Sequence, residues 1–286
     1  MLKNGMVRDL FGLKFLWDKM FPKYEIPLES WPKKDFYSGK TFDVAVLFIA
    51  TGRYITFWKD FYESCQRFFL PNHHVTYFLF TDSDIPVPEN VVKVPHKWRG
   101  WPDETLMRWD TFLKVEKELE KFDFIYFING TMVPVAPIGE EIFPTPDQKL
   151  MVVLHPGFYK RPRHKFTYDE NPKSLACIPK TEGKYYFMGG FNGGCSKDFL
   201  KLIHDLNKAT LADRKNGIVA LWHDESHLNK YMLDKAPLIL TSEYGFPERV
   251  SFNKKNLKVL KDIKMIIKDK SNPKYGGHDW LRGMKK

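Results

Sequence analysis

The chain has 286 residues, 43% of them hydrophobic and 16% aromatic, which is enough for one sizeable core. Its three cysteines, Cys65, Cys177 and Cys195, fit neither a disulfide framework nor a Cys-x-x-Cys metal site, and this favours a reducing compartment. No apolar run reaches the roughly 20 residues of a membrane span, and no signal-peptide pattern occurs, so we expect a cytoplasmic protein.

The formal net charge of +10 is concentrated near the C-terminal end. Between residues 254 and 286, eleven Lys and Arg stand against three Asp. Such a run is either a solvated tail or a surface that binds a polyanion, such as a nucleotide diphosphate, nucleic acid or an acidic membrane. Composition alone favours the solvated tail.

Residues 1–41, which contain three prolines after residue 21, predict an N-terminal arm ahead of a single α/β domain over residues 42–286. Within the arm, segment 10–21 mixes Lys with Trp, Phe and Leu. It could lie at the inner membrane as a peripheral contact, or pack on the protein itself.

Apolar runs in the first half predict three buried parallel strands: Asp43–Ala50, Val75–Phe80 and Phe124–Ile128. Helical spacing lies between them, over residues 57–68 and from Asp103, which we expect to be the N-cap. This alternation predicts a mostly parallel sheet whose ligands bind at the carboxyl ends of the strands. The less regular second half predicts three further elements: Met151–Leu154, Lys184–Phe187 and a helix near Phe199–Leu206.

Two short segments carry the chemistry. Residues 222–230 place Asp224 beside Glu225, and a carboxylate there could stabilise positive charge developing on a sugar carbon. The segment 129–131, Asn-Gly-Thr, follows the third strand. It could be a glycosylation sequon on a secretory surface, a hairpin turn, or a set of ligand contacts.

Several blocks of the sequence occur in the order and spacing of a known family: Phe48–Tyr54, Trp101–Arg108, Ile125–Ile142, His155–Tyr159, Tyr185–Gly194 and Trp222–Lys230. In these blocks the chain resembles glycosyltransferase family 6, which includes the histo-blood-group A and B transferases and bacterial relatives. The resemblance covers about residues 42–250 and, more weakly, the basic tail. It implies a GT-A fold and retaining transfer of GalNAc or Gal from a UDP-sugar, in α linkage, to an acceptor galactoside or oligosaccharide.

The resemblance also bears on metal use. Animal members carry Asp-x-Asp, which holds manganese against the diphosphate, where this chain has Asn129 and Thr131. An amide and a hydroxyl are poor ligands for a hard divalent cation, and bacterial members with Asn-x-Asn work without metal. We therefore expect neither a metal nor another cofactor. Lys268 and Lys270, which match the bacterial tail in pattern, would then neutralise the UDP, together with Arg108, which matches a donor-site arginine.

The family pattern assigns roles in the pocket. Glu225 matches a glutamate that stabilises the oxocarbenium-like transition state, as a covalent nucleophile or as an electrostatic partner. Asp224 matches a residue that binds donor-sugar hydroxyls, and His155 and Trp222 match acceptor contacts. Trp222 could instead belong to the core, and His227 is better explained as a structural histidine.

Donor recognition is expected from two segments. The uridine segment is represented by Ile49, Ala50, Thr51 and Tyr54, and the sugar-specificity segment by Met188, Gly189 and Gly190. Gly190 leaves room for an N-acetyl group, whereas Met188 is the residue of the Gal-specific enzyme. We favour GalNAc because volume at a pocket wall is the harder constraint.

Three other functions compete with this one. His223 and His227 have the spacing of zincin ligands, but Asp224 stands where a zincin has its catalytic Glu. The basic tail raises nucleic-acid binding, although it lacks the aromatic pattern of a single-strand binder, so we expect no nucleic-acid partner. A relative that binds UDP and sugars without catalysis is the third, and the presence of Glu225 and Arg108 argues against it.

Overall fold

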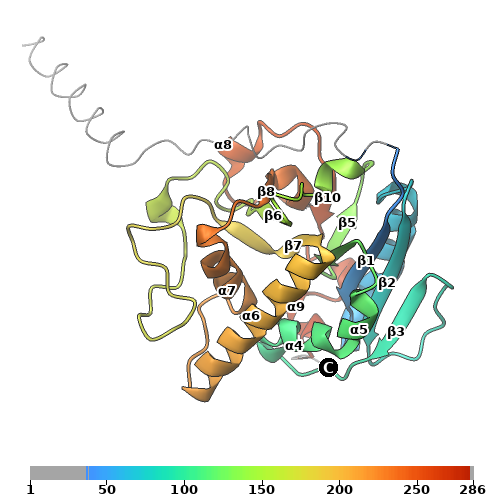
Figure 1. Ribbon diagram of the computed structural model, residues 1–286, viewed down its shortest axis with the longest axis horizontal. Coiled ribbons are helices and arrows are strands. Elements are labelled where there is room, and N and C mark those ends of the chain that lie inside the picture. Colours follow the sequence, from blue (N-terminus) through green and yellow to red (C-terminus); the bar gives the residue numbers. More distant parts are fainter. Residues whose placement is uncertain (1–36, 38, 284–286) are drawn as a thin grey trace, which may run out of the picture.

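The computed structural model describes residues 37 and 39–283. The arm expected over residues 1–41 and its segment 10–21 therefore lie almost wholly outside the described residues. The main sheet has seven strands in the order β3-β2-β1-β4-β7-β6-β8 (Figure 1). Their bounds are β1 Asp43–Ile49, β2 His74–Thr81, β3 Val91–Pro95, β4 Phe124–Ile128, β6 Leu150–Leu154, β7 Phe187–Cys195 and β8 Leu238–Leu240.

Most neighbouring strands in this sheet are parallel. Strands β3, β2, β1 and β4 form a parallel block, β7 runs antiparallel to both β4 and β6, and β6 is parallel to β8. This confirms the predicted mixed, mostly parallel α/β domain. The α-helices are α2 Trp58–Phe68, α3 Asp103–Leu106, α4 Arg108–Phe112, α5 Glu116–Leu119, α6 Ser196–Lys215, α7 Asp224–Tyr231, α8 Lys254–Leu257 and α9 His278–Leu281.

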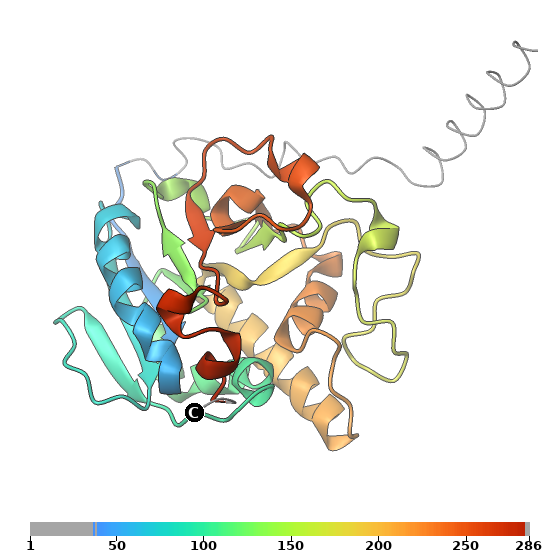
Figure 2. The same cartoon turned by 180° about the vertical axis from the view of Figure 1, so that it is seen from behind.

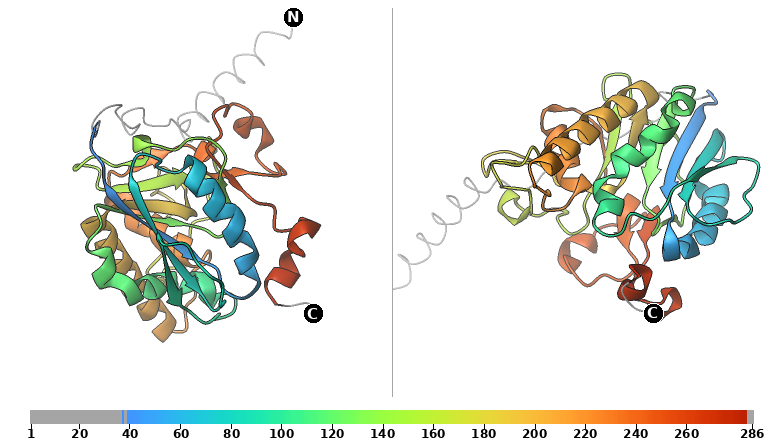
Figure 3. Two further views of the ribbon diagram at one scale, coloured as in Figure 1. Left: turned by 90° about the vertical axis from the view of Figure 1, so that its right-hand side faces the viewer. Right: turned by 90° about the horizontal axis from the view of Figure 1, so that it is seen from below.

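The helices cover both faces of the sheet (Figure 3). Alternate residues of β1 point to opposite faces, as the pleat requires. Val46 and Phe48 belong to the core cluster that contains Phe61 of α2, whereas Leu47 belongs to the cluster that contains Trp109 of α4 and Phe199 of α6. Both faces of β1 are therefore buried, which explains why its sequence is continuously apolar.

The short 3-10 helices mostly mark connections between these elements: η2 Gly52–Phe57, η3 Leu113–Val115, η4 Glu140–Ile142, η5 Arg163–Lys165, η6 Met232–Asp234, η7 Ser242–Gly245 and η8 Pro273–Tyr275. Two of them matter for the site. Helix η2 follows β1 directly, and η7 lies between β8 and the C-terminal segment.

The expected helix from Asp103 is interrupted. Its N-cap is Pro102, and Met107, at φ −98° and ψ 21°, separates α3 from α4. The Asp103 carboxylate accepts a hydrogen bond from Arg214 of α6 at 2.8 Å, so it is engaged with another helix and does not cap its own.

The strand expected at Lys184–Phe187 is also displaced. Strand β7 begins at Phe187 and continues to Cys195. Its glycines allow close approach of the neighbouring strands, because a Cβ on Gly193 would come within 2.4 Å of the Ile125 carbonyl oxygen. The glycines of this strand serve the close approach of its backbone to the neighbouring strands, and a hydrophobic pattern does not reveal this.

A second, three-stranded sheet has the order β5-β10-β9, formed by Met132–Pro134, Met265–Ile267 and Phe246–Pro247. The chain then continues through η8 and α9 on the same side of the molecule as α2 (Figure 2). Up to residue 283, the basic tail is thus folded against the domain, while Lys254, Lys255, Lys258, Lys261 and Lys274 remain exposed to solvent. Among the described residues, no helix has the length and apolar character needed to cross a membrane.

Candidate functional site

The predicted site residues meet at the carboxyl edge of the main sheet. Because β7 runs antiparallel to β4, its first residues lie beside the end of β4. The backbone amide of Asn129 donates to the Gly190 carbonyl at 2.7 Å, and a Cβ on Gly130 would lie 3.2 Å from the Ile49 carbonyl oxygen. The ends of β1 and β4 and the start of β7 therefore form one contiguous rim.

Glu225 is held rigidly at this rim. Its Oε2 accepts a hydrogen bond from the Gly189 amide at 2.8 Å, and its Oε1 accepts one from the Tyr186 hydroxyl at 3.0 Å. Burial raises the pKa of Glu225 to about 7, although both donors oppose this shift. The result is a fixed carboxylate that is partly ionised at neutral pH.

Asp224 is held by a buried ion pair. One guanidinium nitrogen of Arg108 donates to the Asp224 carboxylate at 2.6 Å and to the Gly189 carbonyl at 2.9 Å. The guanidinium also lies 4.1 Å from the centre of the Phe127 ring. Burial raises the pKa of Asp224 to about 6, and the Arg108 charge opposes this. Arg108 thus positions Asp224 and the Gly189 peptide, while its contact with a donor stays a prediction.

The Asn129–Thr131 segment is a turn and not a hairpin, because the following strand β5 pairs with β10. The Asn129 side-chain oxygen accepts hydrogen bonds from the Thr131 amide and hydroxyl, both at 3.2 Å. Manganese, which the family implies for its animal members, prefers charged oxygen ligands. A neutral amide oxygen already engaged by Thr131 is a poor match for it. In the part of the chain described, no cluster of three or more His, Cys, Asp or Glu could hold a metal ion.

The uridine segment continues from β1 into η2. Ala50 and Thr51 are buried, and the Thr51 hydroxyl donates to Glu104 at 2.7 Å. Tyr54 lies in η2, where the Arg282 side chain contacts it and burial raises its pKa.

The C-terminal segment packs against this same helix (Figure 2). Phe57 of η2 and Tyr275 of η8 have ring centres 4.7 Å apart. Arg53 donates to the Trp280 carbonyl at 2.7 Å and lies over its indole. The tail therefore supports the predicted uridine segment from outside.

Lys268 and Lys270 differ in their surroundings. The Lys268 amide donates to the Thr131 carbonyl at 2.8 Å, which places this residue at the rim, but its ammonium is 3.3 Å from the Glu248 carboxylate. Burial lowers the pKa of Lys270, and the nearby Arg282 lowers it further. Lys268 is thus paired with a carboxylate, whereas Lys270 faces a second cation.

Met188 and Gly190, whose preferences conflict, are in contact. A Cβ on Gly190 would meet the Met188 methyl at 2.8 Å and the Met132 sulfur at 3.0 Å. On the opposite face of β7, a Cβ on Gly189 would meet the Asp224 carboxylate at 3.0 Å. The two specificity positions therefore share one space.

The proposed acceptor residues lie beside the carboxylates. His155 follows β6, and its ring packs against Tyr186 with ring centres 5.7 Å apart. Burial lowers the pKa of His155 to about 4, so the ring is neutral at pH 7. Trp222 is 48% exposed, which shows that the core alternative is wrong. Its indole nitrogen donates to the Thr167 hydroxyl at 2.8 Å.

The two histidines of the metalloprotease alternative do not share a helix face. Helix α7 begins at Asp224, and His223 precedes it with a φ of 53°. The His223 ring lies 3.4 Å from the Thr105 hydroxyl. His227 is buried with its ring nitrogen 3.6 Å from the Asp213 carboxylate, which agrees with a structural role.

Four further residues belong to this site although sequence reasoning gave them no role: Tyr186, Glu104, Gly245 and Arg282. Tyr186 stands within a matched block, so its proximity to Glu225 had a sequence signal. Gly245 and Arg282 come from connections far away in the sequence, and only the fold brings them to Met188 and Tyr54.

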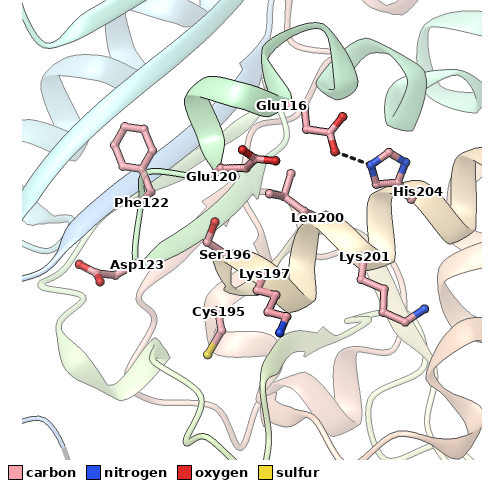
Figure 4. A pocket seen from close by; sticks show the side chains of 10 residues that line it. All are labelled: Glu116, Glu120, Phe122, Asp123, Cys195, Ser196, Lys197, Leu200, Lys201 and His204. Carbon is pink, nitrogen blue, oxygen red and sulfur yellow. Dashed lines mark hydrogen bonds and ion pairs between the residues drawn. The ribbon is translucent and has the colours of Figure 1, made fainter.

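A separate hollow of about 550 Å³ lies at the opposite edge of the sheet (Figure 4). Its wall includes Asp123, just before β4, and Cys195, at the end of β7. Glu116 of α5 and His204 of α6 are hydrogen-bonded across it. None of the predicted site residues lines it, so this hollow is distinct from the site at the carboxyl edge.

Comparison with known proteins agrees with this geometry. The model of glycosyltransferase family 6 matches residues 29–274. The chain is 33% identical over 238 residues to the O-antigen biosynthesis glycosyltransferase WbnI of Escherichia coli, covering 82% of this chain and 98% of that protein. This chain belongs to glycosyltransferase family 6.

Two animal relatives match over a smaller part of their length. Histo-blood group ABO system transferase 1 of Rattus norvegicus is 35% identical over 218 residues, which are 72% of this chain and 62% of the relative. Globoside alpha-1,3-N-acetylgalactosaminyltransferase 1 of Homo sapiens is 29% identical over 225 residues, which are 74% and 63%. The family makes the chain a hexosyltransferase with a nucleotide-sugar donor and a carbohydrate acceptor, which decides against the metalloprotease alternative.

Proposed function

We propose that this enzyme transfers GalNAc, in preference to Gal, from its UDP-sugar to a galactoside or oligosaccharide in α-1,3 linkage. Transfer retains the anomeric configuration and needs no metal ion. The observation that carries the proposal is the Glu225 carboxylate, fixed at the rim by Gly189 and Tyr186. The human relative named above is called an alpha-1,3-N-acetylgalactosaminyltransferase, which supports the sugar and the linkage.

The chemistry follows from where charge develops. As the bond from the sugar to UDP breaks, the anomeric carbon becomes positive, and an ionised carboxylate on the opposite face stabilises it. Glu225 supplies this carboxylate, as a nucleophile or as an electrostatic partner. Asp224, oriented by Arg108, is available for the hydroxyls of the donor sugar.

The leaving diphosphate needs positive charge. Asn129 and Thr131 offer neutral oxygens, so side-chain cations take the role that a metal has in the animal enzymes. The Arg282 charge lowers the pKa of Lys270, so the two cations lie close together, and an anion between them relieves their repulsion. Lys268 lies beside Thr131, because its backbone amide donates to the Thr131 carbonyl, but its ammonium is already paired with the Glu248 carboxylate.

The first test is UDP release from UDP-GalNAc and UDP-Gal across a panel of galactoside and fucosylated acceptors, with excess EDTA or with added manganese. We expect acceptor-dependent release, faster with UDP-GalNAc, at a rate that EDTA leaves nearly unchanged. Loss of most activity in EDTA, restored by manganese, would refute metal independence. UDP binding without release for any acceptor would instead support a non-catalytic relative.

A further inference from the structure

The end of the Met188 side chain is enclosed by three neighbours. Gly190 lies on the side of the rim, Met132 lies beside it, and Gly245 of η7 lies behind it. A Cβ on Gly245 would come within 2.5 Å of the Met188 sulfur and 3.2 Å of its methyl. The Met188 thioether therefore occupies the space that a side chain at residue 245 would need.

The backbone behind Met188 is firmly anchored. The Ser242 hydroxyl donates to the Leu154 carbonyl at 2.6 Å, and the Tyr244 hydroxyl donates to Glu141 at 3.1 Å. Gly245 is buried and does not have a positive φ, so alanine suits its backbone conformation. A methyl group at residue 245 must therefore displace the flexible Met188 side chain and not η7.

Met188 has little freedom in the direction of its displacement. Gly245 would close the space behind it, and the Met132 sulfur already fills the space beside it. On the third side the Met188 methyl already reaches Gly190, where a Cβ would lie 2.8 Å from it. A side chain at residue 245 would thus push the thioether toward the space predicted for the N-acetyl group of the donor.

We propose that Gly245 is a positioning residue for donor specificity. Its missing side chain gives the Met188 sulfur its place over residue 245, and a side chain there would push the thioether further over Gly190, into the room for the N-acetyl group of a UDP-HexNAc. This inference rests on the proposed donor transfer and extends it to η7, whose Gly245 lies against Met188. It also explains how a Met at residue 188 coexists with a preference for GalNAc.

The test is a double-mutant cycle on donor preference, with kcat/KM measured for UDP-GalNAc and UDP-Gal. We expect Gly245→Ala to lower the GalNAc-to-Gal ratio by about 10-fold or more, the effect of a methyl-sized obstruction in a pocket. With Met188→Ala present, Gly245→Ala should change the ratio less than about twofold, because the displaced group is gone. The double variant also relieves the overlap at residue 245, so it folds even where the single variant does not.

An unchanged ratio in Gly245→Ala, or an equal loss in both Met188 backgrounds, would overturn the inference. Thermal unfolding of each variant shows whether the fold is retained. Turnover of both donors with a ratio insensitive to residue 245 contradicts only the role of Gly245. Failure of every variant and of the wild type to consume either donor contradicts the proposed function, and the inference with it.

Discussion

At the scale of single residues, the account depends on Glu225. Glu225→Gln keeps the shape of the side chain and can still bond both Gly189 and Tyr186, but it removes the negative charge. We expect turnover to fall by about 10²–10³, the usual loss for one preorganised electrostatic contact. UDP affinity, measured by calorimetry, should change little. A variant that retains more than about a third of wild-type turnover would show that another group faces the transition state.

Tyr186 offers a separate test through pH. Because burial raises the pKa of Glu225 to about 7, activity should fall as the pH drops through this range and the carboxylate is protonated. Tyr186→Phe removes a donor that favours the charged form, so the acid limb of the pH–rate profile should shift to higher pH. Tyr62→Phe, which loses a hydrogen bond to Asn90 far from the site, is the control. Superimposable profiles for the two variants would exclude this role of Tyr186.

The sequence predicted several of these residues because they stand in long matched blocks. Glu225, Asp224 and Arg108 do meet at one edge, as expected. Their partners are less predictable, since the hydrogen bond from Tyr186 depends on how β7 faces α7. The contact of Gly245 with Met188 joins segments more than fifty residues apart and leaves no pattern in either one.

At the scale of elements, strongly patterned segments were predictable and short ones were not. Strand β4 matches its predicted bounds, Phe124–Ile128, because both of its faces are buried. Strands β5, β9 and β10 have three residues or fewer, too few for any period to appear. The folded C-terminal segment has equally short elements and was also missed. Contacts with η2, such as that between Phe57 and Tyr275, hold it in place, and these leave no periodic pattern in the sequence.

The C-terminal segment distinguishes the two lysines that the sequence treats alike. Lys270→Ala should weaken UDP binding and make the remaining affinity less sensitive to salt. The reason is that it removes a cation whose pKa is lowered by burial and by the Arg282 charge. Lys268→Ala is the matched variant, and its effect should be smaller because Glu248 already pairs with this ammonium. Calorimetry at two salt concentrations measures both. Equal losses for the two variants would mean that Lys268 leaves Glu248 to bind UDP.

At the scale of the whole molecule, the buried carboxylate of Glu225 lowers the stability of the folded state. The pKa of Glu225 in the folded protein, about 7, lies above its ordinary value of 4.5, so the folded state binds the proton more tightly than the unfolded state. Its carboxyl group therefore becomes increasingly unfavourable to folding as the pH rises from about 4.5 to 7. Glu225→Gln should then raise the melting temperature at pH 8 and leave it nearly unchanged at pH 4.5. An equal shift at both pH values would show that the carboxylate is not desolvated.

The fold holds Glu225 at the carboxyl edge of the sheet, and the central claim is retaining transfer assisted by this residue. The most direct measurement is the anomeric configuration of the product formed from UDP-GalNAc and a galactoside acceptor, read from its anomeric proton coupling by NMR. The account predicts an α-linked product, with the configuration of the donor retained. A β-linked product would mean a single inverting displacement, in which Glu225 would have neither of the roles proposed for it.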